Sequence, residues 1–308
     1  MTVHPTTDAG ERTRPARALA YPVSRFARLA GVEVHHEVHG DPPAPALLLS
    51  HHFYGSTRTW RHLTADLARD HLVAAFDRPG FGLTERPRHP WNGVAAPYRR
   101  ATAARIGWEL LDHLDVDEAV LVGSSAGGTN VLEMYAQRPD RVRALVLISP
   151  AITGDVGPPA PIRPLMRTGP LRAVGPRVVR RLTGRVDVAR VSRGWFDSSR
   201  ATAADAEPYQ RMLQVDGWDR GLWEAVCAER PPDLRGVLRT IHVPTLVVAG
   251  DHDSVIAADL SRRTAAAIPD ARFRLIERCG HTPQEERPGE LVTAIRSFLG
   301  DLGDRADH

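Results

Sequence analysis

Short apolar runs alternate with helix-like stretches along most of the chain. By length, composition and flanking turn residues, the runs that fit β-strands are residues 24–29, 32–38, 47–49, 72–76, 119–122, 142–148, 245–249 and 272–276. The stretches that fit helices are about 57–68, 99–114, 127–138, 257–267 and 289–299. Strands that alternate with helices favour an α/β fold. We predict a mostly parallel eight-stranded sheet with helices on both faces, in which the first two strands form a hairpin around Ala30-Gly31.

The alternation breaks between residues 151 and 240. This stretch contains Pro158-Pro159-Ala160-Pro161 near its start, has helix-like patterns and shows no convincing strand. We therefore predict a helical domain (151–240) inserted after the sixth strand into a sheet domain (23–150 and 241–302). Residues 1–22 are polar, contain prolines and follow no pattern, so we predict a flexible leader there.

Composition excludes several function classes. All 40 basic residues of the 308-residue chain are arginines, which excludes Schiff-base chemistry, a lysine base and a Walker-type phosphate loop. A net charge of only +3 and the lack of a binding motif disfavour nucleic acid as a partner. No apolar run approaches the roughly 20 residues that cross a bilayer, and residues 1–22 lack a secretory apolar core, so we expect a cytoplasmic protein. The spacing of Cys227 and Cys279 favours neither a disulfide framework nor a zinc site.

The most informative segment is a predicted strand that runs through Gly123-Ser124-Ser125-Ala126-Gly127 into a predicted helix. Small residues on both sides of Ser125 permit a sharp strand-to-helix turn, since a larger side chain at Gly123 or Gly127 would collide across the bend. Such a turn lifts the Ser125 hydroxyl above the sheet. It also directs the Ala126 N–H and the positive end of the helix towards a developing oxyanion. We therefore predict that Ser125 is a nucleophile.

A serine hydroxyl needs a neutral imidazole to take its proton, and His281 is the candidate base. It lies in the segment CGHTP, on a short loop after the last predicted strand, at the same edge of the sheet as Ser125. The imidazole in turn needs a carboxylate partner. Asp253 follows the predicted strand 245–249 and is the favoured candidate. Asp251 is the alternative, although its position next to the strand end suits a turn cap.

These segments, together with two more, resemble the α/β-hydrolase superfamily. The chain order Ser125, Asp253, His281 is the order found there. The segment FDRPGFG (76–82) resembles the superfamily's D-x-R-G-x-G loop after the fourth strand, GDHD (250–253) resembles its acid loop, and GHTPQEERP (280–288) resembles its histidine loop. The resemblance covers nearly everything outside the leader and the insertion. It implies a serine hydrolase in which the insertion is a cap domain over the active site.

The resemblance also assigns a second oxyanion donor and reveals one departure. Members of the superfamily usually carry H-G-x after the third strand, and the backbone N–H of x is the donor. This chain has HHFYGS (51–56), so Phe53 takes the donor position and His52 replaces the glycine. We expect the β-carbon of His52 to restrict the turn or narrow the pocket. The alternatives are a harmless variation, a polar wall of the site, or loss of catalysis.

Weaker signals give further candidates. The candidate substrate contacts are His52, Tyr54, Trp195, Trp218 and Trp223, and packing inside the helical domain is the alternative for the three tryptophans. His35 and His39 would lie roughly 13 Å apart on one strand, too far to share a metal ion. We expect these histidines and His36 on a solvated strand face. The predicted chemistry requires no metal and no cofactor.

The insertion is also rich in arginine. Arg177, Arg181 and Arg185 recur at intervals of four residues, and we place them opposite Val178, Leu182 and Val186 on an amphipathic basic helix. Such a helix suits an anionic membrane surface, an acidic partner or an anionic substrate, and the alternative is a simple solvated face.

Taken together, the residues predict a serine hydrolase that cleaves an ester-like carbonyl bond of a small, apolar or aromatic substrate through an acyl-enzyme. A C–C bond hydrolase, a lactonase and a lyase are alternatives on the same three residues. A ligand-binding protein without turnover is the alternative from another class. The serine at position 125 disfavours a dehalogenase or an epoxide hydrolase, because those reactions need a carboxylate nucleophile.

Overall fold

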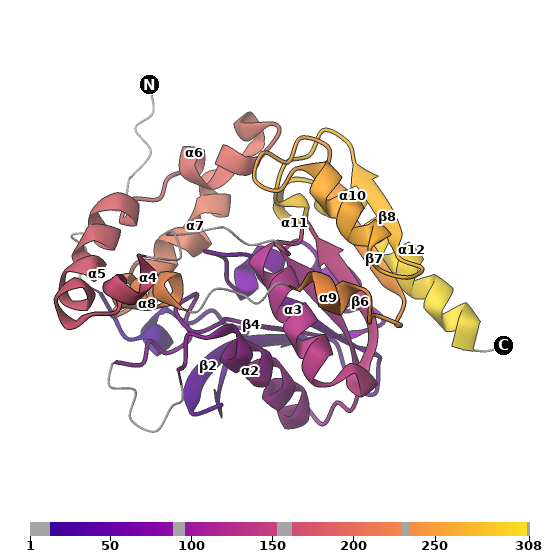
Figure 1. Ribbon diagram of the computed structural model, residues 1–308, viewed down its shortest axis with the longest axis horizontal. Helices are drawn as coiled ribbons and strands as arrows, with labels where there is room; N and C mark the ends of the chain where they lie inside the picture. The colour runs from indigo at the N-terminus through magenta and orange to yellow at the C-terminus, as the bar shows by residue number, and fades with distance from the viewer. Residues whose placement is uncertain (1–12, 89–95, 153–161, 229–233, 307–308) are drawn as a thin grey trace.

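A computed structural model describes residues 13–88, 96–152, 162–228 and 234–306. It contains one eight-stranded sheet (Figure 1), with strands β1 (Ser24–Leu29), β2 (Val32–His39), β3 (Ala46–Ser50), β4 (Leu72–Phe76), β5 (Ala119–Ser124), β6 (Val142–Ile148), β7 (Thr245–Gly250) and β8 (Arg272–Ile276). Their order across the sheet is β1-β2-β4-β3-β5-β6-β7-β8. β2 is antiparallel to β1 and to β4, and all other neighbouring strands are parallel. The predicted α/β fold with a mostly parallel sheet is confirmed.

The helices follow the strands in the expected places. The α-helices are α1 (Thr64–Leu67), α2 (Arg100–His113), α3 (Ala126–Gln137), α4 (Arg163–Met166), α5 (Gly169–Thr183), α6 (Val188–Val191), α7 (Ala203–Met212), α8 (Trp218–Cys227), α9 (Arg235–Leu238), α10 (Ala258–Ala266), α11 (Pro283–Glu286) and α12 (Pro288–Ala306). The 3₁₀ helices are η1 (Ala16–Leu19), η2 (Thr57–Trp60), η3 (Pro139–Arg141), η4 (Ser192–Gly194) and η5 (Ser198–Arg200).

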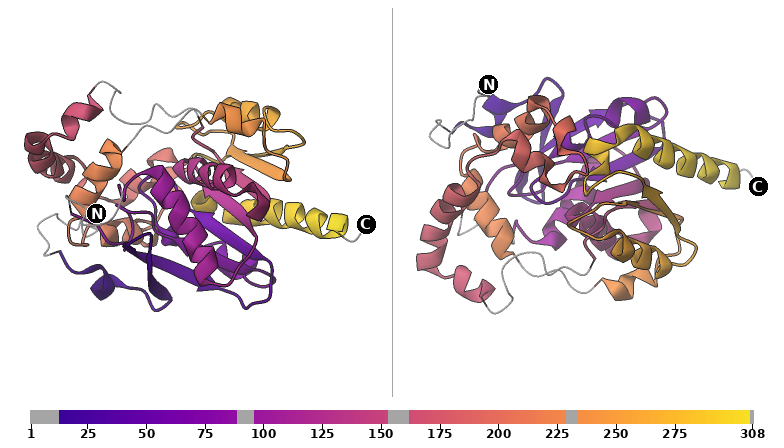
Figure 2. Two further views of the ribbon diagram at one scale, coloured as in Figure 1. Left: turned by 60° about the horizontal axis from the view of Figure 1, so that its bottom comes forward. Right: turned by 90° about the horizontal axis from the view of Figure 1, so that it is seen from above.

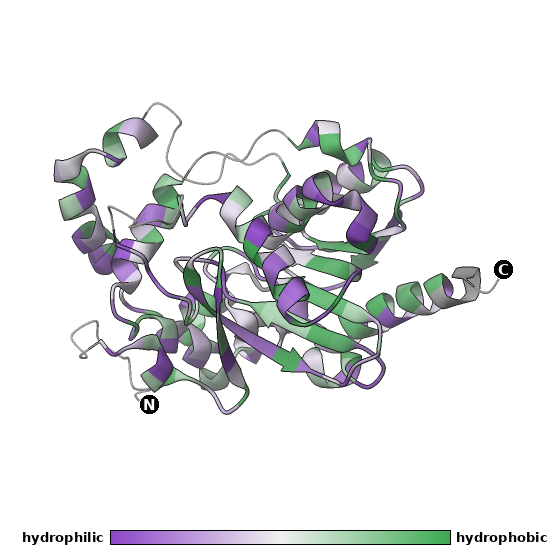
Figure 3. Cartoon of the chain, turned by 90° about the horizontal axis from the view of Figure 1, so that it is seen from below, coloured by the Kyte–Doolittle hydropathy of each residue, from purple (hydrophilic) through white to green (hydrophobic). Residues whose placement is uncertain are grey.

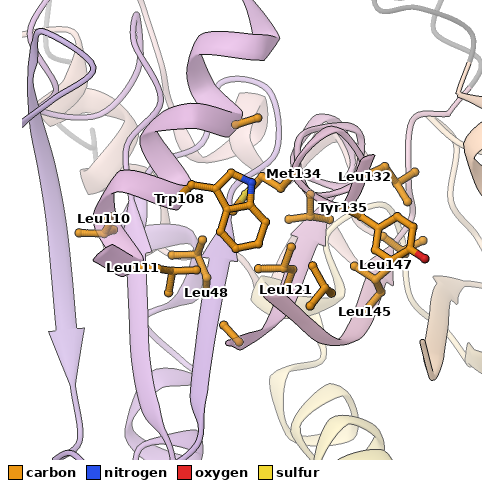
Figure 4. Packing of buried hydrophobic residues seen from close by; sticks show 14 of the residues in the cluster. Leu48, Trp108, Leu110, Leu111, Leu121, Leu132, Met134, Tyr135, Leu145 and Leu147 are labelled. Atoms are coloured by element: carbon orange, nitrogen blue, oxygen red, sulfur yellow. The ribbon is translucent and has the colours of Figure 1, made fainter. Parts of the chain in front are cut away.

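The sheet is the centre of the apolar core, and its middle strands are predominantly hydrophobic (Figure 3). Alternate residues of a strand point to opposite faces. Leu48 and Leu121 therefore pack with α2 and α3 on one face, where Trp108 and Leu132 cover them (Figure 4). Residues on the other face, such as Leu49 and Val122, pack with α1 and α12 through Leu67, Leu291 and Ile295. Burial on both faces explains why these strands read as unbroken apolar runs.

Two local predictions meet different outcomes. The hairpin is confirmed, because Leu29 pairs with Val32 across Ala30 and Gly31, whose φ angles are 48° and 78°. The single helix predicted over 57–68 is wrong, because the chain forms the short helices η2 and α1 there. The apolar side chains of that stretch, Trp60, Leu63 and Leu67, are nevertheless fully buried, so packing on the sheet decides the local geometry.

The chain between β6 and β7 forms helices α4 to α9, and its described residues contain no strand. Figure 1 shows α4, α5, α7 and α8 grouped at one side of the sheet. α9 differs, because Leu234 and Leu238 belong to the same apolar cluster as the β6 residues Leu145 and Leu147. The packing therefore assigns α9 to the sheet rather than to the helical domain predicted to extend to residue 240.

The predicted flexible leader divides into two parts. Residues 1–12 lie outside the described residues. Residues 13–22 contact the rest of the chain, since Leu19 is buried against Leu83 and Val215, and the N–H of Arg14 donates to the carbonyl of Gln214 (2.8 Å). The expectation of flexibility is therefore corrected for residues 13–22, because a buried leucine anchors them.

Candidate active site

Ser125 lies at the bend between β5 and α3. Its φ of 50° and ψ of −114° form a strained conformation, of a kind that proteins retain mainly at functional sites. The bend has no room for side chains at its glycines. A β-carbon at Gly123 would lie 2.5 Å from the carbonyl oxygen of Gly127, and a β-carbon at Gly127 would overlap the carbonyl oxygen of Ser50. The Ser125 N–H donates to the carbonyl of Ile148 (2.8 Å), which anchors the bend to β6.

The N–H of Ala126 opens the first turn of α3, where backbone donors have no partner inside the helix. The N–H of Gly128 donates back to the carbonyl of Ser125 (2.9 Å). The N–H of Ala126 has no acceptor among the described residues. It lies at the positive end of a helix of 12 residues and can therefore donate to a negatively charged oxygen beside Ser125.

Asp253 and His281 contact each other at the carboxyl ends of β7 and β8. Nδ1 of His281 lies 3.0 Å from Oδ1 and 2.9 Å from Oδ2 of Asp253, and both side chains are buried. Oδ1 of Asp253 also accepts hydrogen bonds from the N–H groups of Val255 (2.9 Å) and Ile256 (2.8 Å). This contact holds the proton of a neutral imidazole on Nδ1 and leaves Nε2 to act as a base.

The electrostatics also favour Asp253 as the partner of His281. Burial alone would raise the pKa of Asp253, but the hydrogen bond from His281 and the charge of His281 bring that pKa below its ordinary value. The carboxylate is therefore ionised at neutral pH. The alternative, Asp251, instead contacts Nδ1 of His252 (2.7 Å) and the N–H of Cys279 (3.1 Å), which is the geometry of a turn cap.

Ser125 and His281 reach the same edge of the sheet. Within the described residues, no hydrogen bond joins Oγ of Ser125 to Nε2 of His281. Both lie beside the loop after β3. Gly127 of the bend packs on the carbonyls of Ser50 and His51, and the charge of His281 contributes to lowering the pKa of His52. In hydrolases without substrate such contacts are often long and shorten in the complex.

The loop after β3 forms a turn, in which the N–H of Gly55 donates to the carbonyl of His52 (3.1 Å). Tyr54 has the left-handed φ of 70°, whereas His52 does not adopt a positive φ. The conformation that favours glycine is therefore required at position 54 and not at position 52. This corrects the expectation that the β-carbon of His52 restricts the turn.

Arg78 fixes the direction of the peptide groups in this loop. Its guanidinium donates to the carbonyls of His51 (2.8 Å) and His52 (3.0 Å). In a trans peptide the N–H points away from the preceding carbonyl, so the N–H of Phe53 points away from Arg78. That N–H has no acceptor within the described part of the chain. Burial lowers the pKa of Arg78 to about 10, which leaves the side chain charged at neutral pH.

His52 belongs to a buried polar network that the sequence did not predict. Its Nε2 lies 3.2 Å from Oη of Tyr209, which in turn donates to both carboxylate oxygens of Glu285 (3.1 and 3.0 Å). Arg61 donates to Oε1 of Glu285 (3.1 Å) and pairs with Asp205. Burial lowers the pKa of His52 well below its ordinary value, so its ring is neutral. Because Tyr209 donates to Glu285, Nε2–H of His52 is the donor to Tyr209.

Burial also raises the pKa of Glu285, against the effect of the Arg61 charge. Through this network the loop after β3 is joined to α7 and to α11. The five side chains come from three separate parts of the chain, and no short motif links them: His52 and Arg61 follow β3, Asp205 and Tyr209 lie on α7, and Glu285 lies on α11. Glu285 lies in the GHTPQEERP segment and His52 was a candidate polar wall, but nothing in the sequence indicated Tyr209, Arg61 or Asp205.

Glu286 holds the loop that carries His281. Its Oε2 accepts a hydrogen bond from the N–H of Gly280 (2.7 Å), and its Oε1 accepts one from the N–H of Asp197 (3.0 Å). The N–H of His281 donates to the carbonyl of Gly194 (2.7 Å). Segments of the insertion around η4 and η5 therefore fix the position of the histidine loop. Glu286 is part of the GHTPQEERP segment, and here the motif was informative.

The candidate substrate contacts have different environments. The ring of Tyr54 stacks on Tyr209 with centroids 6.3 Å apart, and its hydroxyl donates to the carbonyl of Thr183 (3.3 Å). Burial raises the pKa of Tyr54 to about 12. Trp195 follows Gly194, so its backbone lies beside the histidine loop, where a β-carbon on Gly280 would come within 2.8 Å of its Cα.

Trp223 packs inside the helical insertion, and Trp218 packs where the insertion meets the loop after β4. Trp218 belongs to an apolar cluster with Phe81, Met212 and Leu222, and Trp223 belongs to a cluster with Met166 and Cys227. A β-carbon on Gly175 of α5 would overlap the ring of Trp223. Packing explains both residues, as the alternative interpretation of the sequence stated, and we do not carry them forward as substrate contacts.

The histidines of β2 are not on a solvated face. His35 and His36 are buried, because β2 is paired on both sides and both faces of the sheet are covered. Nδ1 of His35 lies 2.7 Å from Oδ2 of Asp77. Burial lowers the pKa of His36 to about 4. The expectation is corrected for these two residues, while the side chain of His39 is 23% exposed.

The described residues contain no group of three or more His, Cys, Asp or Glu side chains placed to hold a metal ion. None of their helices has the length and apolarity needed to cross a bilayer.

The fold and this site define the class of protein. The profile described as the alpha/beta hydrolase fold matches residues 45–288. The chain belongs to the alpha/beta hydrolase fold family and is a hydrolase of that fold.

Proteins similar to this chain are named after different hydrolytic reactions. Epoxide hydrolase A of Mycobacterium tuberculosis is 28% identical, over 91% of this chain and 98% of the relative. A 2-hydroxymuconate semialdehyde hydrolase of Pseudomonas sp. (strain CF600) is 30% identical, over 79% of this chain and 81% of the relative. Among solved structures, a thermophilic esterase from Thermogutta terrifontis superposes with a TM-score of 0.71 at 23% identity, over 91% of this chain and 98% of that one. At that identity the structural likeness supports the fold alone.

Proposed function

We propose that this protein is a serine hydrolase that cleaves an ester-like carbonyl bond of a small, apolar or aromatic substrate. Ser125 attacks the carbonyl carbon through Oγ while Nε2 of His281 takes the hydroxyl proton. Asp253 orients His281 and stabilises its charged form. The N–H groups of Phe53 and Ala126 donate to the resulting oxyanion.

The rest of the cycle follows from the same groups. His281 returns the proton to the leaving alcohol as the C–O bond breaks, which leaves the acyl group as an ester of Ser125. Water then attacks this ester while His281 takes one of its protons. His281 returns that proton to Oγ of Ser125 as the acyl C–O bond breaks, so the acid is released and the serine hydroxyl is regenerated. No further group is needed to balance either half of the reaction.

The single observation that carries the proposal is the buried contact between Asp253 and His281 on the sheet edge that also carries the strained Ser125 bend. A structural bend alone gives no reason for a histidine–carboxylate pair nearby. The predicted oxyanion donors support the same chemistry, because the N–H groups of Phe53 and Ala126 have no acceptor among the described residues.

We also propose that α4 to α8 form a cap over this site. Three contacts support the assignment: Tyr209 of α7 with His52, Thr183 of α5 with Tyr54, and Asp197 with Glu286. Tyr54 and Trp195, which lie at these contacts, remain our predictions for substrate contacts. A cap that touches the loops around Ser125 would exclude water and set the size of the pocket.

A second candidate reaction is hydrolysis of a C–C bond. The observation that favours it is the 30% identity to a protein named as a 2-hydroxymuconate semialdehyde hydrolase. The epoxide hydrolase of Mycobacterium tuberculosis is a weaker guide to the reaction. A serine stands at the bend, and direct opening of an epoxide requires a carboxylate nucleophile there.

The test is hydrolysis of a short p-nitrophenyl ester by the wild type, by Ser125→Ala and by Ser124→Ala. Ser125→Ala is expected to lose on the order of 10⁴ to 10⁶ in kcat. Ser124→Ala is the matched control, since the neighbouring hydroxyl is buried in β5 without a partner among the described residues. Equal rates for the wild type and Ser125→Ala would refute the assignment.

Labelling with a fluorophosphonate, read by intact mass, separates the alternatives. A reactive Ser125 without ester turnover favours the C–C candidate, which a 2-hydroxy-6-oxohexadienoate substrate then tests. Failure of the probe to label the wild type would indicate a ligand-binding protein without turnover.

A further inference from the structure

Helix α5 exposes a stripe of aliphatic side chains on the surface of the insertion. Val174, Val178 and Leu182 follow one another at intervals of four residues, and they are 51%, 46% and 67% exposed. Residues four apart lie on the same side of a helix. Ile162 and Leu165, at and beside α4, are 47% and 58% exposed. The five side chains form what we call the α4–α5 face.

The opposite side of α5 is the packed side. Gly175 lies against the ring of Trp223, and Val179 joins the apolar clusters of α8. Two arginines on this side are paired with α8, Arg172 with Glu224 (2.7 Å) and Arg180 with Asp219 (2.9 Å). The exposed stripe is therefore not the side that attaches α5 to the protein.

Arginines lie beside the exposed stripe. Arg177 and Arg181 are exposed and follow Val174 and Val178 by three residues, so they flank the stripe on the same side of α5. The prediction that Arg177, Arg181 and Arg185 lie opposite Val178, Leu182 and Val186 on one helix is wrong, because Val178 and Leu182 are exposed and Val186 is buried after the helix has ended at Thr183.

The charge of this segment has one sign only. Residues 162–186 contain seven arginines (Arg163, Arg167, Arg172, Arg177, Arg180, Arg181 and Arg185) and no aspartate or glutamate. Figures 1 and 2 show α5 at the outer edge of the molecule, on the side away from the end of α12. Two of the seven, Arg172 and Arg180, are paired with α8 on the packed side, whereas Arg177 and Arg181 flank the exposed stripe. The α4–α5 face is thus flanked by arginines, partly apolar and outermost.

We propose that the α4–α5 face docks on an anionic phospholipid bilayer. Aliphatic side chains beside arginines on one side of a helix suit the boundary between acyl chains and charged headgroups. Phosphate groups supply the negative charge that this segment lacks. A symmetric contact with a second copy of the chain fits poorly, because it would place arginines against arginines. Nucleic acid fits poorly because the centre of the face is aliphatic.

The test uses the full chain and two kinds of vesicle, pure phosphatidylcholine and phosphatidylcholine with about 30% phosphatidylserine. We expect co-sedimentation with the anionic vesicles at low salt, weaker by on the order of tenfold or more on pure phosphatidylcholine or at high salt. Arg177→Glu/Arg181→Glu and, separately, Leu182→Asp should each reduce binding to the anionic vesicles by a similar factor.

Matched controls separate this face from net charge. Arg69→Glu/Arg263→Glu changes the total charge equally at side chains that are 73% and 74% exposed on other parts of the surface. Leu260→Asp adds one charge at a leucine that is 43% exposed on α10. Both control variants should bind as the wild type does. Circular dichroism and thermal unfolding show whether each variant is folded, and Arg177→Gln/Arg181→Gln repeats the test with a smaller change.

Three results would overturn the proposal. One is the absence of binding to anionic vesicles. Another is an equal loss of binding in the control variants, which would indicate attraction by net charge alone. The third is a dimer, found by analytical ultracentrifugation, that Leu182→Asp dissociates, because the face would then be covered by a second copy.

Discussion

Oη of Tyr209 lies 3.2 Å from Nε2 of His52, and this contact joins a helix of the insertion to the loop that carries the Phe53 N–H. Tyr209 also donates to Glu285, four residues after His281. The two sides of the candidate site therefore meet at one buried hydroxyl. Because the pKa of His52 is far below its ordinary value, this contact keeps its form across the neutral pH range.

Tyr209→Phe is expected to reduce both stability and turnover. It removes the hydroxyl but leaves buried His52 and Glu285, so unfolding should become easier by about 1–3 kcal/mol. A loosened loop should lower kcat by on the order of tenfold with little change in KM. Steady-state kinetics and urea unfolding measure the two effects. Tyr135→Phe is the control, because Tyr135 lies near the end of α3 that is away from Ser125 and its hydroxyl donates to the carbonyl of Thr240 (2.8 Å). A similar loss of kcat in both variants would argue against a positioning role.

Asp253→Asn and Asp251→Asn distinguish the two candidate acids. Asn at 253 keeps the shape but cannot hold the charged imidazole, and kcat should fall on the order of 10⁴-fold. Asn at 251 should change kcat little and reduce stability by about 1 kcal/mol, because it weakens the contacts with His252 and the Cys279 N–H. Kinetics on a p-nitrophenyl ester decide between them, and the reverse ranking would assign the role to Asp251.

Gly127→Ala tests the tightness of the bend. The added β-carbon would overlap the carbonyl oxygen of Ser50, so β3 or the bend must move. We expect a loss of stability of about 2 kcal/mol or more and a large loss of fluorophosphonate labelling. Gly289→Ala in α12 is the control, because nothing lies within 4 Å of its added β-carbon. Unchanged labelling of Gly127→Ala would contradict the prediction.

The free energy of unfolding should decrease when the pH is lowered, because of His36. Its pKa of about 4 in the folded state is below the ordinary value of 6.5, so between these values the unfolded chain binds a proton that the folded chain does not. Stability is therefore lost as pH falls from 6.5 towards 4, by about 3 kcal/mol from this residue. Urea unfolding of the wild type and of His36→Leu across this range measures the difference. Parallel stability curves for the two proteins would show that His36 contributes nothing.

Much of the fold follows from local pattern. Buried strands such as 72–76 and 142–148 were predicted with the boundaries that the structure has, because burial on both faces requires unbroken apolar runs. The prediction of one helix over 57–68 was wrong. Its apolar spacing fits two short helices equally well, because both arrangements bury Trp60, Leu63 and Leu67 on the sheet. The prediction that His35 and His36 lie on a solvated face was wrong, because a polar residue in a strand does not reveal whether it has a buried partner. For His35 that partner is the carboxylate of Asp77.

By itself the sequence determined the strand–helix alternation, the small residues around position 125 and the motifs that hold Asp253 and His281, because each is written in neighbouring residues. The tertiary structure decided which aspartate meets His281, how Arg78 orients the peptide groups before Phe53, and that Tyr209 and Glu285 join His52. It also decided that the aliphatic stripe of α5 faces outward. These relationships depend on chain segments brought together by folding, and local periodicity does not encode which segment lies opposite another.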